Sequence, residues 1–250
     1  MNINLKDLTF YYISTNTKMG LKRSFHLENI MKQFNLNVFR IKSVHHLHKN
    51  IGGALGHSLA LRKGLLQNEF KPFVVLEDDI AFFNSDNNSD SNNNSDKFDI
   101  SIPQNTDALL LGISYVGLAH DSNDKYSDLY LQNVNNFPNL FRIFNMLSMH
   151  AILYVNPKFA SVQYIALMEA INRSLLGEFV VWDTVCCHQY HKYNIYALKV
   201  PIFYQLRILG GQEDGTKTNL LNYNEKLKDD GLYCSLPTIT GMLTKYLLNN

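Results

Sequence analysis

The eight residues Phe73–Ile80 constrain the fold more than any other stretch of this chain. Four apolar residues, two of them β-branched, run directly into three acids, Glu77, Asp78 and Asp79. An apolar run of this kind is typical of a strand buried on both faces, as in a parallel sheet. Acids at the end of such a strand are expected at the edge of the sheet, where open α/β folds bind their ligands.

The three acids predict a site for a divalent cation. If the chain stays extended, side chains alternate, so that Glu77 and Asp79 share one side and Asp78 points to the other. Two carboxylates spaced in this way suit a hard cation that completes its coordination with water and phosphate oxygens. Such a cation holds a nucleotide diphosphate and offsets its charge as it leaves. The alternative interpretation is an acidic strand end that faces water or a helix N-terminus.

Length and composition fit one large α/β domain and argue against several other classes. The chain has 250 residues, 46% of them apolar, which is enough for a substantial core. With 23 Lys and Arg against 22 Asp and Glu, no dedicated nucleic-acid surface is expected. We find no secretory signal and no transmembrane stretch, and the three cysteines lack zinc-site spacing. These features predict a cytoplasmic protein and leave the oligomeric state open.

Strand and helix patterns alternate along the chain, which predicts a sheet covered by helices. Strands are expected over residues 8–14, 38–41, 106–112, 149–155 and 195–200, and helices over 21–34 and 51–67 and from Pro157 onward. The segment 84–97 is almost entirely Asn, Ser and Asp, so we expect a disordered insertion there. The tail from about residue 217 is expected to be helical and peripheral.

Turn residues near the predicted strand ends supply further candidates. Ser14 and Thr15 follow the first strand and are placed to contact a nucleoside, although plain turn chemistry also explains them. Gly53 lies in a glycine-rich helix start that allows close backbone approach to a ligand or to a neighbouring strand. Gly112 and Ser114 follow the strand 106–112 and are expected beside the acids.

Histidines and a second acid complete the list of candidates. His45, His46 and His48 form a cluster that suggests either a metal site or a solvated loop. Asp183 interrupts the apolar stretch that begins at Phe179, and we expect a helix after it. Asp183 is therefore either the cap of that helix or a general base in an apolar wall.

Taken together, these motifs resemble glycosyltransferase family 25, the lipopolysaccharide-type and collagen galactosyltransferases. The resemblance covers the chain from about Phe10 to Gly215, outside the insertion. Its motifs are a first strand with an Arg-containing helix, a glycine-rich helix with a Ser-His pair, the acidic strand, and three later pairs. In this chain they correspond to Tyr12-Ile13-Ser14 with Arg23, Gly52–Ser58 with His57 and Ser58 in swapped order, Val75–Asp79, His150-Ala151, Trp182-Asp183 and Pro201 with Gln205.

The resemblance implies a GT-A type fold, a Rossmann-like mixed, mostly parallel sheet flanked by helices. It implies a UDP-sugar donor, Mn²⁺ or Mg²⁺, and a hydroxyl acceptor on a glycan or a protein. By this analogy Asp79 and Glu77 bind the metal, His188 or His191 adds a ligand, and Asp183 deprotonates the acceptor. The implied donor-binding residues are Ser14, Thr15, Arg23, Gly53, His57, Glu77, Asp78, Gly112 and Ser114.

Two other functions remain open from the sequence. One is a degenerate transferase that holds a nucleotide or a glycan without turnover. The other is a phosphate-releasing enzyme on a similar sheet, which needs a nucleophile at a strand end, where Asp78 is the available residue.

Overall fold

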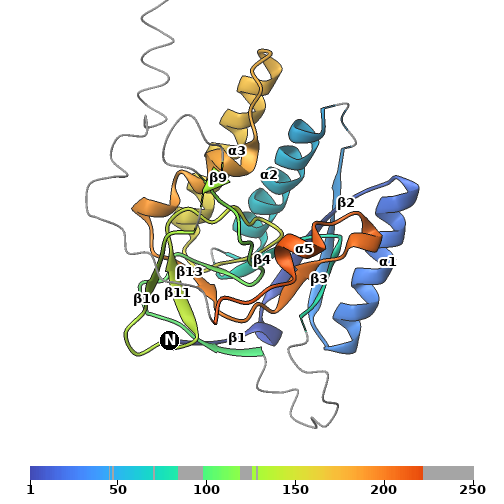
Figure 1. Cartoon of the computed structure of the whole chain (residues 1–250). Coiled ribbons are helices and arrows are strands. Elements are labelled where there is room, and N and C mark those ends of the chain that lie inside the picture. Colours follow the sequence, from blue (N-terminus) through green and yellow to red (C-terminus); the bar gives the residue numbers. More distant parts are fainter. Residues whose placement is uncertain are drawn as a thin grey trace, which may run out of the picture.

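A computed structural model describes residues 1–44, 46, 48–69, 71–83, 98–118, 126–127 and 129–221 (Figure 1). The predicted insertion at 84–97 and most of the predicted tail lie outside these residues, as does His45.

An eight-stranded sheet forms the centre of the molecule, in the order β10-β11-β13-β7-β12-β4-β2-β3. In chain order its strands are β2 (Thr9–Thr15), β3 (Asn37–Ser43), β4 (Phe73–Glu77), β7 (Ala108–Leu110), β10 (Leu131–Asn133), β11 (Leu140–Ile143), β12 (Ala151–Tyr154) and β13 (Ile195–Leu198). Strands β3, β2 and β4 are parallel neighbours, so their carboxyl ends lie at one edge. That edge is where the sequence places the ligand site.

The expected mixed sheet flanked by helices is confirmed, with six of its eight strands in one direction, although four of its seven neighbouring pairs are antiparallel. Strand β12 runs antiparallel to both of its neighbours, and β11 does the same. The other strands, β3, β2, β4, β7, β13 and β10, all run in one direction. Buried apolar residues explain the central position of β4, because all of Phe73–Leu76 are at most 1% exposed.

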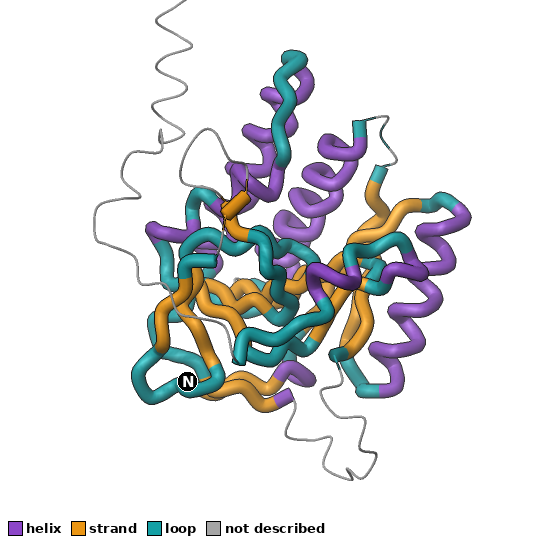
Figure 2. Tube along the Cα trace, viewed as in Figure 1, coloured by secondary structure: helices purple, strands orange, loops and turns teal. Residues whose placement is uncertain are grey.

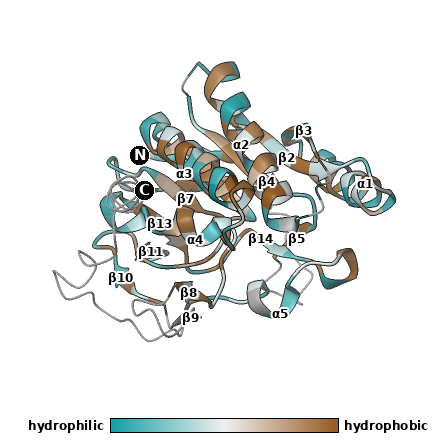
Figure 3. Ribbon diagram, turned by 90° about the horizontal axis from the view of Figure 1, so that it is seen from above, coloured by the Kyte–Doolittle hydropathy of each residue, from teal (hydrophilic) through white to brown (hydrophobic). Residues whose placement is uncertain are grey.

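Helices cover both faces of the sheet (Figures 2 and 3). Helices α2 (Lys49–Gln67) and α3 (Pro157–Leu175) pack together on one face, with α4 (Trp182–Cys187) beside them. Helix α1 (Lys18–Gln33) covers the other face through Leu27 and Met31. The short helix α5 (Glu213–Thr216) follows the last strand.

Caps account for where two of these helices begin. The Thr17 side chain accepts a hydrogen bond from the Gly20 N–H at 3.1 Å, so α1 begins three residues before the predicted Leu21. Asn156 caps α3 in the same way, with Pro157 in the first turn, as the sequence predicted.

Short strands and turns complete the described fold. The two-stranded pairs are β1 (Asn2–Asn4) with β6 (Asp99–Ser101), β5 (Ile80–Phe82) with β14 (Phe203–Gln205), and β8 (Gly117–Leu118) with β9 (Tyr126–Ser127). Three 3₁₀ turns span Leu5–Asp7, Tyr190–Lys192 and Arg207–Leu209. The described residues of the range 116–140 thus include β8, β9 and β10. In the described residues, no helix has the length and apolar character needed to cross a membrane.

Candidate active site

Strand β4 ends at Glu77, and Asp78 and Asp79 form a turn that leads into β5. The expected alternation of these acids is therefore wrong, because it assumed an extended chain through Asp79. The turn instead presents all three carboxylates to one cleft. Asp78 and Asp79 are each 6% exposed, so the cleft holds buried negative charge.

The cleft has a volume of about 340 Å³ and lies at the carboxyl ends of β2, β3 and β4. The lining residues come from those strand ends, from α1, from the start of α2 and from the acidic turn. They are Ile13, Ser14, Thr15, Arg23, Ser43, Val44, His46, Gly52, Gly53, His57, Glu77, Asp78 and Asp79. Seven of the predicted donor-binding residues and both predicted metal-binding acids are thus brought together.

Glu77 is held by side chains from two distant parts of the chain. His57 Nε2 lies 3.3 Å from Glu77 Oε1, and Gln205 Nε2 donates to Glu77 Oε2 at 2.7 Å. Burial raises the pKa of Glu77, but the hydrogen bond and the charge of His57 outweigh it, so the net shift is downward. Glu77 therefore stays anionic more readily than an ordinary glutamate.

The pKa of Asp79 shifts in the opposite direction from that of Glu77. Burial and the neighbouring Glu77 carboxylate raise the pKa of Asp79 to about 7, while the charge of Arg23 acts against that rise. The Gln205 amide nitrogen also lies 3.4 Å from Asp79 Oδ1, so one amide group touches both acids. The side chains of Glu77 and Asp79 are therefore neighbours at the same amide group.

Arg23 is the basic residue of the cleft. Its Nη1 lies 3.1 Å from Asp78 Oδ1 and 4.0 Å from Asp79 Oδ2. Burial raises the pKa of Asp78, and bonds from Ser14 and Arg23 reduce that rise. The Arg23 Nε donates to the Leu209 carbonyl at 2.6 Å, which ties the last described segment to the acids.

Ser14 and Thr15 have different surroundings within the lining. Ser14 is 2% exposed and donates to the Gly20 carbonyl at 2.9 Å, so it fixes the start of α1. Thr15 is partly exposed, and its hydroxyl lies 2.8 Å from that of Thr17. Of the pair, Thr15 is the more open to a ligand.

Gly53 permits a close contact between α2 and α4. A Cβ on Gly53 would lie 2.8 Å from Trp182 Nε1, closer than Cβ atoms approach neighbouring atoms in real structures. One turn further along α2, the His57 ring lies 4.5 Å from the Trp182 ring, centroid to centroid. This contact explains Gly53 by packing and places Trp182 against Gly53 and His57, while Trp182 and Asp183 themselves do not line the cleft.

Asp183 lies in the first turn of α4, whose cap is Val181, so Asp183 is not the cap. Burial raises the pKa of Asp183, and the charge of Glu77 adds to the rise, while the Thr184 N–H opposes it. Its Oδ1 is buried with no hydrogen-bond partner among the described residues. A buried carboxylate oxygen without a donor is a suitable acceptor for a substrate hydroxyl proton.

Gly112 and Ser114 lie behind the site and are not part of the lining. A Cβ on Gly112 would lie 2.1 Å from His150 Nε2, so Gly112 makes room for His150. Ser114 is 7% exposed and accepts a hydrogen bond from the Val116 N–H at 3.0 Å, a local turn contact. Burial lowers the pKa of His150 to about 4, which makes it a neutral neighbour of Glu77.

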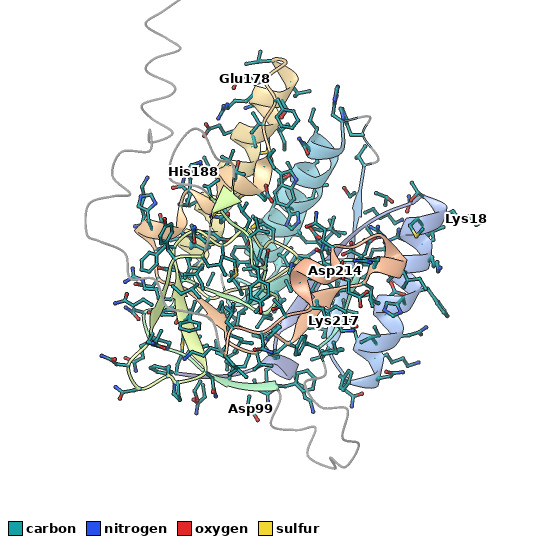
Figure 4. All side chains as sticks on the ribbon, in the orientation of Figure 1. Lys18, Asp99, Glu178, His188, Asp214 and Lys217 are labelled. Carbon is teal, nitrogen blue, oxygen red and sulfur yellow. The ribbon has the colours of Figure 1, made fainter. Side chains whose placement is uncertain are left out.

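His188 is not brought to the acids. It follows α4 and is labelled in Figure 4. The charged groups that act on it are His191, Arg173 and Lys192. Burial lowers the pKa of His188 first, and these basic groups lower it further. The acids of the cleft exert no comparable effect there, so the structure does not support the predicted His188 ligand.

The residues Gln205, Trp182 and Leu209 were not predicted as site residues. Gln205 was visible in the sequence through the Pro201–Gln205 pair of the family resemblance. Trp182 was visible as the neighbour of Asp183. The carbonyl of Leu209 carries no sequence signal, because any residue has one.

The acidic turn suits a divalent cation in its chemistry. Glu77 and Asp79 supply carboxylate oxygens, the atoms that Mg²⁺ and Mn²⁺ prefer. Among the described residues no group of three His, Cys, Asp or Glu side chains is arranged to hold a metal. A cation held by these two acids therefore needs phosphate or water oxygens to complete its coordination, as Mg²⁺ commonly does.

Comparisons with known proteins give fold similarities and no family. No family model matches the chain, and no curated protein matches it. The crystal structure of A197 from STIV aligns at 13% identity and a TM-score of 0.41, covering 80% of this chain and 85% of that chain. A glycosyltransferase involved in the glycosylation of the major capsid of PBCV-1 aligns at 9% identity and a TM-score of 0.47, covering 80% and 92%.

Proposed function

We propose that this chain is a metal-dependent glycosyltransferase of GT-A type, with a UDP-sugar as donor. The observation that carries the proposal is the acidic turn Glu77–Asp79, which lies in a cleft at the carboxyl ends of three parallel strands. Three carboxylates there face one arginine, so the cleft has an excess of negative charge. A cation that carries a diphosphate balances that excess.

Each element of the cleft has a defined part in this proposal. Glu77 and Asp79 hold Mn²⁺ or Mg²⁺, which supplies compensation for the charge of the departing diphosphate. Thr15 and the end of β3 border the space for the nucleoside. Arg23 lines the cleft beside Asp78, and its guanidinium is also able to pair with the phosphate oxygens of the donor.

Asp183 is the general base of the proposal. Its free Oδ1 accepts the proton of the acceptor hydroxyl as that oxygen attacks the sugar. The pKa of Asp183 is raised and so lies nearer to neutral pH than that of an ordinary aspartate. A general base accepts and later releases a proton most efficiently when its pKa is near the operating pH. Trp182, whose ring contacts the His57 ring, fixes the orientation of the helix that carries this base.

The ion pair of Arg23 favours one rival function, a degenerate module that binds nucleotide without metal. Arg23 already neutralises Asp78 at 3.1 Å, and an arginine alone binds phosphate oxygens well. The two functions differ in their need for metal, because only the transferase requires a cation at Glu77 and Asp79.

The test is a thermal-shift panel of nucleotide sugars with Mn²⁺ and with a chelator. A ligand bound only by the folded state raises the melting temperature by mass action. We expect UDP with Mn²⁺ to stabilise the wild-type protein and the Asp183→Asn variant equally, and to leave Asp79→Ala unchanged. In a transfer assay with the donor that the panel identifies, Asp183→Asn is expected to lose roughly 10²–10⁴-fold in rate, the usual contribution of a general base.

The outcomes separate the rival functions. Tight binding of UDP and Mn²⁺ by Asp79→Ala would remove the metal assignment. Equal binding with the chelator, together with no hydrolysis or transfer by the wild-type protein, would support the degenerate module.

A further inference from the structure

Charge is distributed unevenly along this nearly neutral chain. The 40 residues from Asn29 to Asn68 contain six Lys and Arg residues and no Asp or Glu. They include β3 and α2, which are packed against each other. The rest of the chain is therefore acidic overall, and the β3–α2 unit is its basic part.

A groove of about 450 Å³ lies between β3 and α2. Basic and aliphatic residues line it, with no acid: Arg40, Ile41, Lys42, Leu59, Arg62, Lys63, Leu66 and Gln67. Leu59 is 39% exposed and Leu66 68% exposed, so the groove offers apolar surface as well as charge. It is separate from the acidic cleft and shares no lining residue with it.

Strand β3 has a free edge beside this groove. It is the last strand of the sheet order, and in the described residues it pairs with β2 alone. An edge strand presents unpaired N–H and C=O groups that a further strand is able to pair with. The seven residues of β3 provide enough length for such an addition.

Positive charge flanks this edge on both faces. Ile41 belongs to the core under α2, whereas Val38 packs in the core under α1, so Arg40 and Lys42 point to the α1 side. Arg62 and Lys63 lie on the α2 side. Arg40 donates a hydrogen bond to the Thr15 carbonyl at 2.6 Å. Lys42, Arg62 and Lys63 form no ion pair within the described part of the chain.

Lysine on an edge strand normally protects it against pairing with identical copies. Two copies of β3 would bring cations against cations, which is unfavourable. An acidic strand meets no such repulsion, so the same charges that exclude a second copy select an acidic partner.

We propose that the edge of β3 binds an extended acidic peptide segment of a partner protein that has an aliphatic residue at every fourth position. Because side chains alternate along a strand, the residues of this segment that face α2 are then alternately aliphatic and acidic, and those that face α1 are acidic. Its backbone pairs with β3, its aliphatic side chains contact Leu59 and Leu66, and its carboxylates meet Lys42, Arg62 and Lys63. This is strand addition, in which main-chain hydrogen bonds give affinity and alternate side chains give specificity. The proposal does not depend on the transferase function.

The test uses a fluorescein-labelled peptide of repeated Val-Glu-Glu-Glu, with fluorescence polarisation as readout. The full-length chain is expected to bind it, and Arg62→Glu with Lys63→Glu to weaken binding roughly tenfold or more, because like charges then oppose. The matched control, Lys158→Glu with Lys192→Glu, changes net charge equally at exposed positions of other elements and is expected to bind normally. If charge reversal prevents folding, Arg62→Gln with Lys63→Gln replaces it.

Two N-methylated forms of the peptide distinguish strand addition from simple charge attraction. One form is methylated on every odd nitrogen and the other on every even nitrogen. A strand added to an edge uses the N–H groups of one set, so one form is expected to bind and the other to lose roughly tenfold or more in affinity.

Three results would overturn the proposal. The first is equal binding of the two methylated forms, and the second is equal effects of the groove and control variants. The third is binding of heparin without binding of the peptide, which would identify an anionic polymer as the ligand.

Discussion

At the scale of single residues, the acidic turn concentrates unfavourable interactions in one place. Asp79 is buried next to Glu77, and this combination raises the pKa of Asp79 to about 7, from an ordinary value of 3.8. Buried like charges are common at functional sites, where a ligand relieves them. The acids therefore cost stability in the free protein, and that cost must depend on pH.

The sign of the dependence follows from proton binding. Between pH 3.8 and about 7 the folded state holds a proton on Asp79 that the unfolded chain releases. This group therefore destabilises the fold progressively as pH rises through that window. Above about pH 7 this loss of stability is complete, because Asp79 is then ionised in the folded and the unfolded state alike.

We predict that Asp79→Asn raises the free energy of unfolding at pH 8 but changes that free energy little at pH 4. The gain is of the order of a few kcal/mol, since one pKa unit corresponds to about 1.4 kcal/mol. Urea unfolding with a chelator present, at a series of pH values, measures it. Asp99→Asn on the exposed part of β6 is the control, and a pH-independent difference between Asp79→Asn and the wild type would refute the prediction.

At the scale of elements, close contacts of glycines set how α2 lies on the sheet. A Cβ on Gly64 would lie 2.3 Å from the Phe73 ring. That ring is 1% exposed and stacks on Tyr154 at 5.5 Å, so it has no room to move. Gly52 in the same helix has no atom closer than 3.4 Å to such a Cβ.

The two glycines thus predict opposite effects of alanine. Gly64→Ala is expected to destabilise the protein by about 1–3 kcal/mol through overpacking. Gly52→Ala is expected to be neutral or stabilising by up to about 1 kcal/mol, because alanine favours a helix. Urea unfolding of both variants checks this, and a Gly64→Ala protein as stable as Gly52→Ala would contradict the close packing of α2.

Elements were predicted from sequence more reliably than the site. Six of the eight strands of the central sheet, the three long helices and the edge that carries the acids follow from apolar periodicity, as in Phe73–Leu76. The short strands β10 and β11 were not predicted. The turn at Asp78 did not, because a Glu-Asp-Asp sequence is compatible with both a strand and a turn. Gln205 and Leu209 meet the acids only through the pairing of β14 with β5, a contact between distant residues that no local pattern encodes.

At the scale of the whole molecule, one side chain joins parts of the chain that are 186 residues apart. Arg23 on α1 holds the Leu209 carbonyl with one nitrogen and Asp78 with another. The neighbouring Leu206 N–H donates to the Asp79 carbonyl at 2.7 Å, and that of Gly211 to the Leu206 carbonyl at 2.9 Å. The beginning, middle and end of the described chain therefore meet at the acids.

We predict that Arg23→Lys loosens the segment 206–211 while the protein stays folded. Lysine keeps the charge but lacks the planar fork that reaches both partners. Amide exchange of Leu206 and Gly211 is expected to accelerate about tenfold, since a hydrogen bond from a charged group contributes about 1.5–3 kcal/mol. Arg173→Lys on α3 is the control, and unchanged exchange in Arg23→Lys would show that the arginine does not hold the segment.

The contact between the Trp182 and His57 rings also gives the molecule an intrinsic optical sensor. Trp182 is the single tryptophan of the chain, so its emission comes from one known location. The ring beside it touches Glu77, and protonation of an imidazole in contact with an indole quenches fluorescence. Occupation of the cleft is thus expected to be readable in unlabelled protein, from the light that this one side chain emits.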